Sequence, residues 1–394
     1  MKANYLQKNI NLLYFISFFH NLLFWLGTWI LFYLLFTDYA GIGIIETVMI
    51  VTILIFEVPS GALADLLGKK KVLFLAFLIV AIAQFMMAGA INFLMLILSV
   101  FLNSVGTTMV SGTFEAITYD TLKDFKKTKQ YNKVFSKQTS ISYLAMVIAT
   151  PVGGWLYAHF DPQLPFVAVG VMNLVAMFLV YFLTEPSVDT EKFSWQKYYL
   201  QNKQGLQIIF SEKKLQTMLP FLFVSGAIML IVYEMVGDLL IVSVAKTVEK
   251  ISMATFFIIF SSMFSVQIAP FLEKMFGLSK SFIGLAFLYV LILFIASVVD
   301  FPEIIVIGIL LSGIWSVSKV IQSKIINSNT PSKYRATTLS TVNMLIAIPY
   351  VCSAVFLGYL ADKYTVQKVV IVLAVVMMVG LTFGYLRLFQ KNNF

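Results

Sequence analysis

A few charged side chains interrupt the long apolar stretches of this sequence. Glu57, Glu115 and Lys319 each stand within such a stretch. An ionised group surrounded by hydrocarbon is costly, so these side chains are expected to face protein or water. An acid in such a place can take up and give up a proton, which makes Glu57 and Glu115 candidate proton-coupling residues. For Glu57, a structural hydrogen bond to a neighbouring helix end is the alternative.

A second pair of acids, Glu234 and Asp238, is spaced by one helical turn and follows directly on Tyr233. A helix would place both carboxylates on one face, where they form a second candidate proton-coupling site. The alternative is an ordinary helix end in water. Glu46 lies near the end of its apolar stretch, and we expect it to be solvated.

Aromatic and amide side chains stand near these charges in the first apolar stretch. Asn21, Trp25 and Trp29 recur every fourth residue, so a helix would place them on one face, next to His20. Such a face could line a substrate cavity. Packing of Trp and Asn against neighbouring helices is the alternative.

The second half of the chain resembles a copy of the first. Gly154 matches Gly358 at an offset near 204 residues, and the same offset relates Glu115 to Lys319. We hypothesise that these two charges face a central cavity and pair or exchange partners. The alternative is that both reach water at the membrane surface.

The face that carries Lys319 adds further candidates for the substrate cavity. Trp315, Lys319 and Gln322 share one helical face. Tyr233 is the aromatic neighbour of the second acid pair, and we include it among the candidate cavity residues.

The sequence lacks the motifs of enzymes and metal proteins. It contains no HExxH and no GxxxxGK[ST] pattern, and Cys352 is its lone cysteine. His20 and His159 are too far apart in the chain to suggest a metal pair. We therefore expect no enzymatic activity, no metal and no cofactor, so that any energy for transport would come from an ion gradient.

The elements that carry these residues are expected to be membrane-spanning helices. Of the 394 residues, 60% are hydrophobic and 12% are charged, which excludes an ordinary soluble protein. Cutting at charge, Pro and Gly clusters gives twelve apolar spans, each near the roughly 20 residues that cross hydrocarbon as a helix. The spans are roughly 11–36, 42–63, 72–91, 93–119, 138–158, 165–183, 218–241, 252–272, 281–299, 304–326, 338–361 and 367–388.

The basic residues predict the orientation of these spans. Most of the 28 Lys and Arg fall at the two termini and in the loops on their side of the membrane. The opposite side carries Lys246, Lys250, Lys363 and Lys368. This bias places both termini in the cytoplasm. The net charge of +9 is thus a topology signal that needs no nucleic-acid partner, and the six lysines of residues 123–137 are expected to meet anionic lipids.

The eleven residues 61–71 form the expected elbow between the second and third spans. Gly61 and Gly68 remove side chains where helix ends approach or the backbone turns. Asp65 and Lys69 are four residues apart and could pair, and Lys70 continues the basic run.

This pattern, Gly-x-x-x-Asp-x-x-Gly-Lys-Lys, resembles the signature loop between helices 2 and 3 of the major facilitator superfamily. Leu66 departs from it, because the family usually carries Arg or Lys there. The resemblance implies an all-α integral membrane fold with twelve transmembrane helices in two pseudo-symmetric six-helix bundles. We expect bundles at 1–183 and 218–394, joined by a central cytoplasmic loop at 184–217.

The resemblance also implies a role for Asp120. In the family an acid near the cytoplasmic end of helix 4 packs beside the signature loop. We expect Asp65, Lys69 and Asp120 to form a conformational latch. The alternative for Asp120 is a helix end in water. The motif Gly358-Tyr-Leu-Ala-Asp362 also imitates the signature, but it falls on the outer side and is interpreted as a lookalike.

Three functions remain open. The first is a proton-coupled exporter of amphipathic or cationic small molecules that works by alternating access, as the resemblance to efflux-type members implies. The second is an importer of a small solute, which Lys319 favours if that solute is an anion. The third is a receptor or scaffold without transport. We expect a monomer in the cell inner membrane, with protons, lipids and a small-molecule substrate as partners.

Overall fold

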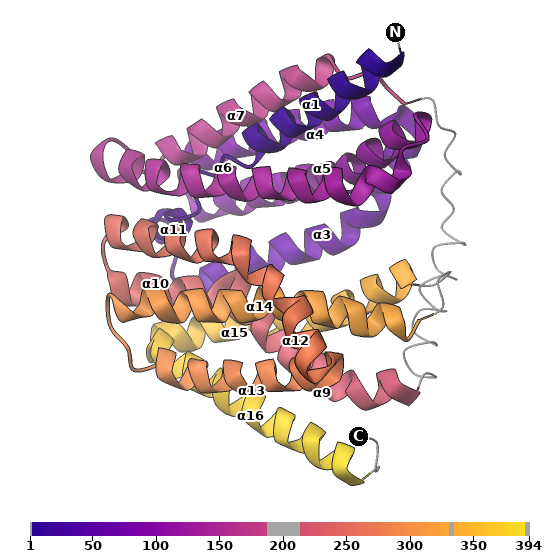
Figure 1. Ribbon diagram of the computed structural model, residues 1–394. Helices are drawn as coiled ribbons and strands as arrows, with labels where there is room; N and C mark the ends of the chain where they lie inside the picture. The colour runs from indigo at the N-terminus through magenta and orange to yellow at the C-terminus, as the bar shows by residue number, and fades with distance from the viewer. Residues whose placement is uncertain (1, 187–212, 331–334, 391–394) are drawn as a thin grey trace. The chain divides into compact units, whose positions relative to one another are not determined.

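The computed structural model describes residues 2–186, 213–330 and 335–390, and the elements within these ranges are helices (Figure 1). Most of the predicted central loop lies outside them. The first half contains α1 (Lys2–His20), α2 (Trp29–Tyr33), α3 (Tyr39–Leu67), α4 (Lys69–Ala88), α5 (Phe93–Asp124), η1 (Thr128–Gln130), α6 (Tyr131–His159) and α7 (Leu164–Tyr181). The second half contains α9 (Lys213–Ile231), η2 (Val232–Val236), α10 (Gly237–Ala245), α11 (Val248–Ser265), η3 (Val266–Ile268), α12 (Ala269–Phe276), α13 (Leu278–Ala296), α14 (Glu303–Ser328), α15 (Arg335–Lys363) and α16 (Val366–Gln390).

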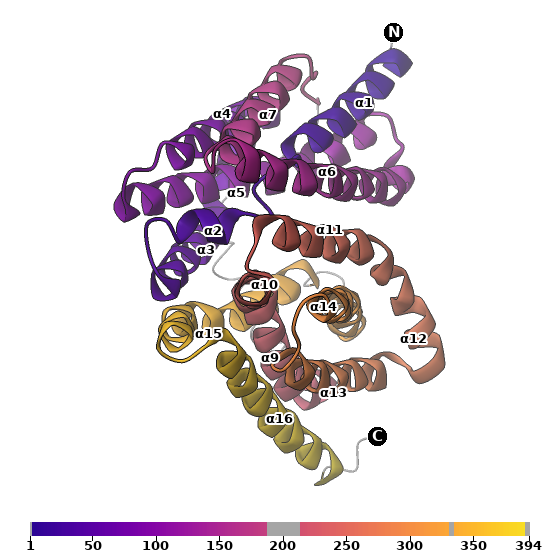
Figure 2. The ribbon, with the colours of Figure 1, turned by 90° about the vertical axis from the view of Figure 1, so that its left-hand side faces the viewer.

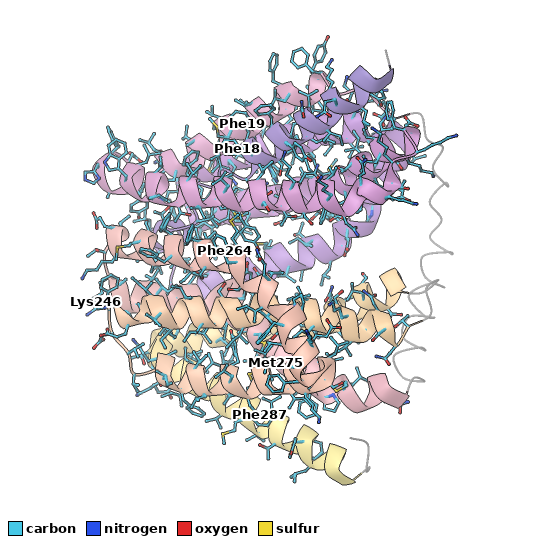
Figure 3. The ribbon with its side chains drawn as sticks, in the orientation of Figure 1. Phe18, Phe19, Lys246, Phe264, Met275 and Phe287 are labelled. Atoms are coloured by element: carbon cyan, nitrogen blue, oxygen red, sulfur yellow. The ribbon has the colours of Figure 1, made fainter. Side chains whose placement is uncertain are left out.

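Eleven helical stretches in the described ranges are long and apolar enough to cross a membrane. They correspond to all of the predicted spans except the first. Large apolar side chains remain exposed on them, among them Phe264, Met275 and Phe287 (Figure 3). A water-soluble protein rarely leaves so much apolar surface uncovered, so these faces suit contact with lipid chains.

The described residues form two compact units. Unit 1 comprises residues 2–37, 48–186 and 247–260, and unit 2 comprises 38–47, 213–246, 261–330 and 335–390. Each unit is built mainly from one half of the chain and includes a short segment of the other half. Consequently α3 starts in unit 2 and continues in unit 1, whereas α11 starts in unit 1 and ends in unit 2.

The core of unit 1 lies among α1, α4, α5 and α7. Leu13, Phe77 and Ile117 are fully buried there. Helix α5 approaches α4 closely because Gly106 has no side chain, since a Cβ at this position would lie 2.6 Å from Val80 Cγ2. A well-packed apolar core of this kind holds the polar side chains of the unit in fixed places.

In unit 2, α9 packs against α15 and α16, and α14 packs against α13, η3 and α12. Figure 2 looks nearly along α14 and shows α13 and α12 beside it. Gly226 of α9 allows the close contact with α15, because a Cβ there would lie 2.8 Å from Ile346 Cδ1.

The first predicted span is a broken helix. Helix α1 ends at His20, residues 21–28 are turns, and α2 begins at Trp29. The prediction that Asn21, Trp25 and Trp29 share one helical face is therefore wrong. The backbone of Phe24 packs so closely on Gly153 of α6 that no side chain would fit between them. This tertiary contact with α6 holds the unwound stretch in place. The spacing of residues within the first span cannot indicate such a contact.

The predicted elbow at 61–71 is reduced to a single residue. Helix α3 continues to Leu67 and α4 begins at Lys69, so only Gly68 separates them. Gly68 has a φ of 93°, a left-handed conformation that glycine adopts without strain. The chain turns at this glycine because the seven residues before it remain helical.

One further detail predicted for the elbow, the close approach at Gly61, is wrong. Gly61 lies inside α3, and no neighbouring atom in the described part of the chain comes within 4 Å of where its Cβ would be. It therefore makes no close helix contact. Asp65 and Lys69 belong to different helices. The side chain of Asp65 lies outside the described part, so the pairing of these two residues stays a prediction.

Helices α9 and α10 form one span with a π-helical turn, η2, between them. The N–H of Gly237 donates to the carbonyl of Val232, five residues earlier. A Cβ at Gly237 would lie 2.6 Å from that carbonyl oxygen, so glycine suits this turn. Single π-turns inside α-helices are frequent at functional sites, and this one carries Tyr233 and Glu234. The span ends at a left-handed residue, Lys246, with φ 63°.

Candidate functional site

Two of the predicted latch residues, Lys69 and Asp120, form an ion pair between α4 and α5 in unit 1, and their role as a conformational latch stays a prediction. Lys69 Nζ lies 2.6 Å from Asp120 Oδ2, and both side chains are about nine-tenths buried. A buried pair of this kind is costly to break, because removal of one partner leaves an uncompensated charge. The predicted contact between Lys69 and Asp120 is thus confirmed. The alternative, in which Asp120 ends its helix in water, is wrong.

Glu185 completes this site, and sequence reasoning missed it. Its two carboxylate oxygens accept hydrogen bonds of 2.7 Å from the backbone N–H groups of Lys69 and Lys70. A carboxylate at a helix N-terminus satisfies free donors and complements the helix dipole. The ammonium of Lys70 also lies 5.4 Å from the centre of the Tyr181 ring. Glu185 is 116 positions from Lys69 in the chain, so spacing provides no signal for this contact.

Unit 1 contains a cavity of about 350 Å³ formed by α1, α5 and α6. Its wall combines one carboxylate with hydroxyl, amide, aromatic and thioether side chains: Ser17, His20, Asn21, Thr107, Val110, Ser111, Phe114, Glu115, Phe135, Gln138, Thr139, Ser142, Tyr143 and Met146. Cavities of roughly 300–1,000 Å³ with a few placed polar groups hold drug-sized ligands.

The end of α1 supplies the polar corner of this cavity. His20 Nδ1 lies 2.8 Å from Asn173 Oδ1, and the Asn173 amide donates to the carbonyl of Val169. His20 Nδ1 is therefore the donor of this pair. Asn21 donates to the carbonyl of Ser17. Phe18 and Phe19 belong to the same last turn of α1 (Figure 3).

The structure places His20, Asn21 and Glu115 in the wall of one cavity of unit 1, and their roles in substrate binding and proton coupling stay predictions. Trp25 is not part of the cavity wall, and its buried indole N–H has no hydrogen-bond partner within the described ranges. Glu57 has an exposed side chain on α3. Its role as a proton-coupling residue stays a prediction.

In unit 2, the predicted cavity residues of α14 meet the π-turn. The Tyr233 ring stacks on Trp315 with centroids 5.3 Å apart. Lys319 Nζ lies 4.9 Å from the centre of the Trp315 ring and 3.4 Å from Asn343 Oδ1. Gln322 is buried, and its Nε2 has no hydrogen-bond partner within the described residues.

The two acids of the π-turn region belong to a larger group of carboxylates in unit 2. Glu234 interacts electrostatically with Asp238 and with Lys319. Glu46 interacts with both Glu234 and Asp238, and its Oε2 accepts a hydrogen bond of 2.7 Å from Tyr350 Oη. Glu46 is only 5% exposed. The prediction that it is solvated is wrong, because α15 covers it.

Glu115 and Lys319 lie in different units. The neighbours of Lys319 described above all belong to its own unit, and the predicted exchange of partners between these two charges stays a hypothesis. Within the described ranges, no group of three or more His, Cys, Asp or Glu residues could hold a metal ion.

Asp362 has a role in unit 2 that the sequence interpretation did not give it. Its carboxylate accepts hydrogen bonds from the backbone N–H groups of Tyr39, at 3.1 Å, and Ala40, at 2.8 Å. It thereby caps the start of α3. The motif that looked like a copy of the signature loop is thus a helix cap.

Comparisons with known proteins agree with this architecture. A sequence model of the Major Facilitator Superfamily matches residues 11–247, more than half of the chain. The chain is 29% identical over 196 residues to YxaM of Bacillus subtilis, an uncharacterized MFS-type transporter. It is 22% identical over 152 residues to the quinolone resistance protein NorA of Staphylococcus aureus. The match to YxaM covers 47% of both proteins, and the match to NorA covers 38% of both. The chain thus spans less than half the length of these relatives.

Solved structures resemble the whole chain. The nucleoside transporter NupG has a TM-score of 0.80 at 16% identity, covering 96% of this chain and 98% of its own. A bacterial homolog of the human lysosomal transporter Spinster has a TM-score of 0.74 at 12% identity, covering 98% and 96%. The POT family transporter PepTSo has a TM-score of 0.72 at 11% identity, covering 98% of both chains.

At these identities the structural likeness shows the fold alone, and it confirms the predicted twelve-helix architecture. The family match covers the broken first span and runs into the second half of the chain. Together with the apolar helices, these findings establish that the chain crosses a membrane several times and belongs to the Major Facilitator Superfamily.

Proposed function

We propose that this chain is a secondary active transporter that exports amphipathic or cationic small molecules in exchange for protons. The observation that carries the proposal is the unit 1 cavity, which has the volume of a drug-sized ligand and contains one carboxylate, that of Glu115. Phe114, Phe135 and Tyr143 offer aromatic faces to a cation, and Met146 adds an adaptable apolar contact.

The coupling to protons follows from the acids inside the apolar helices. The sequence contains no GxxxxGK[ST] phosphate-binding motif, and we propose an ion gradient as the energy source. Acids that reach each side of the membrane in turn can carry protons through alternating access. The similarity to NorA, a quinolone resistance protein, supports the outward direction. We further propose that the protein acts as a monomer in the inner membrane, with both termini in the cytoplasm.

A second candidate function is import of a small solute. The partly buried cation of Lys319, beside Trp315 and Tyr233, favours this function for an anionic substrate. The nucleoside transporter and the POT family transporter among the structural neighbours share the fold at low identity.

The test is transport of a fluorescent lipophilic cation in inverted membrane vesicles, with and without a proton uncoupler. We expect uptake into these vesicles that the uncoupler abolishes. Glu115→Gln keeps the size of the side chain and removes its charge, so it should reduce this flux by roughly tenfold, the loss of one modest interaction. Glu249→Gln, which alters an exposed acid outside the cavity, is the matched control and should transport normally.

An uncoupler-insensitive flux would contradict proton coupling, and normal flux in Glu115→Gln would remove this acid from the site. If a broad panel of cations gives no flux while anionic solutes are transported in the direction of the cytoplasm, import is the correct function. No flux of either kind would support a receptor or scaffold.

A further inference from the structure

The start of α3 is fastened to α15 within unit 2. Besides the cap by Asp362, two glycines bring the helices together. Gly43 faces the backbone of Ala354, and Gly358 faces the backbone of Tyr39, both so closely that a side chain would not fit. The first turns of α3 therefore depend on α15 for their position, although the rest of α3 belongs to unit 1.

Glu46 lies in the middle of this contact. Glu46 is 5% exposed, and Tyr350 of α15, whose hydroxyl donates to its carboxylate at 2.7 Å, is 0% exposed. The other groups that act on Glu46 electrostatically within the described residues are Glu234 of η2 and Asp238 of α10, both acids. Lys319 of α14 acts on Glu234.

An ionised Glu46 is poorly accommodated in this place. Burial removes the water that stabilises its charge, one phenol donor replaces only part of that water, and two acids repel it. A protonated Glu46 avoids all three penalties, because it carries no charge. The smaller cost that remains is the burial of a neutral polar group. The packed arrangement must therefore bind this proton more tightly than an arrangement in which Glu46 meets water. By linkage, proton binding must favour the packed arrangement to the same extent.

We propose that Glu46 is a proton-binding residue whose protonation fastens the start of α3 to α15 and whose ionisation releases it. The proton is bound as the two helices close and is released to water when they part. The charge bias predicts that this contact lies on the outer side of the membrane.

The experiment measures the distance between α3 and α15 in the full-length protein in lipid nanodiscs. Spin labels are placed at two exposed positions, Ile44 and Phe356, after the exposed Cys352 is replaced by Ser. We expect the population with the short distance to fall as the pH rises. In Glu46→Gln the amide still accepts from Tyr350 but cannot ionise, so the short distance should persist at every pH. Glu303→Gln, an exposed acid of α14, is the matched control and should behave like the unmodified chain.

Tyr350→Phe provides an independent variant. Loss of the phenol donor removes support from the charged carboxylate only, so the midpoint of the pH transition should move upward by roughly one unit. The proposal is overturned if Glu46→Gln keeps the pH response of the unmodified chain, or if neither protein responds to pH. A midpoint unchanged in Tyr350→Phe would also oppose it. Transport in vesicles is measured separately. A pH-dependent distance between α3 and α15 without any transport would contradict the proposed function but would still support this inference.

Discussion

Lys69 and Asp120 show how one buried pair can decide local stability. Their side chains lie 2.6 Å apart and are almost wholly removed from water. The family resemblance identified both residues, and the structure adds Glu185, which binds the backbone at Lys69 and Lys70. Together these three charged residues join α4, α5 and the segment that follows α7 at one point.

We predict that Lys69→Met destabilises the protein by about 3–5 kcal/mol, because Asp120 is then buried without a partner. The double variant Lys69→Met with Asp120→Leu should recover most of the loss, since apolar side chains of similar size can replace a buried pair. Thermal unfolding in detergent measures both. Lys133→Met, at an exposed lysine of α6, is the control. A double variant as unstable as the single one would contradict this reasoning.

At the scale of the element, glycines place the irregular turns of this molecule. Gly68 allows the one-residue elbow, and Gly153 allows the unwound stretch after α1 to pack on α6. Gly237 allows the π-turn that carries Tyr233 and Glu234. Each of these glycines thus lies where the chain departs from a regular α-helix or lies against such a departure.

Gly237→Ala should therefore disturb the π-turn. Its Cβ would lie 2.6 Å from the carbonyl oxygen of Val232, and relief of that clash should cost about 1–3 kcal/mol. We expect a lower melting temperature and a smaller uncoupler-sensitive flux. Gly284→Ala is the matched control, because no neighbouring atom in the described residues lies within 4 Å of its Cβ position. That change should leave the flux intact and stabilise the protein by about 0.4–1 kcal/mol. Equal behaviour of the two variants would refute the role of Gly237.

At the scale of the whole molecule, the arrangement of charge predicts how the chain lies in the membrane. Lys246, labelled in Figure 3, forms the exposed turn between α10 and α11 and belongs to the predicted outer side. Lys133 is exposed at the start of α6, in the lysine-rich region predicted to face the cytoplasm.

Labelling with a membrane-impermeant maleimide tests this orientation in intact cells. In a Cys352→Ser background, Lys246→Cys should be labelled directly, whereas Lys133→Cys should react only after the membrane is permeabilised. The physical reason is the preference of Lys and Arg for cytoplasmic loops. The reverse labelling pattern would overturn the topology and, with it, the assignment of Glu46 to the outer side.

Local properties of the sequence were sufficient for the spans, the family and several site residues. The hydropathy of a span is set by consecutive residues, so it can be read from the sequence alone. Eleven predicted spans accordingly match observed helices. The signature motif identified Lys69, and the family resemblance identified Asp120. Three of the residues singled out in the sequence, His20, Asn21 and Glu115, line one cavity of unit 1.

Contacts between distant residues required the tertiary structure. Glu46 and Tyr350 are 304 positions apart, and Asp362 is 323 positions from Tyr39. No local pattern distinguishes a solvated acid near a helix end from one that another helix covers. The break after His20 was missed for the same reason, because the contact with Gly153 comes from α6. Burial and pairing depend on which surfaces meet, and only packing decides that.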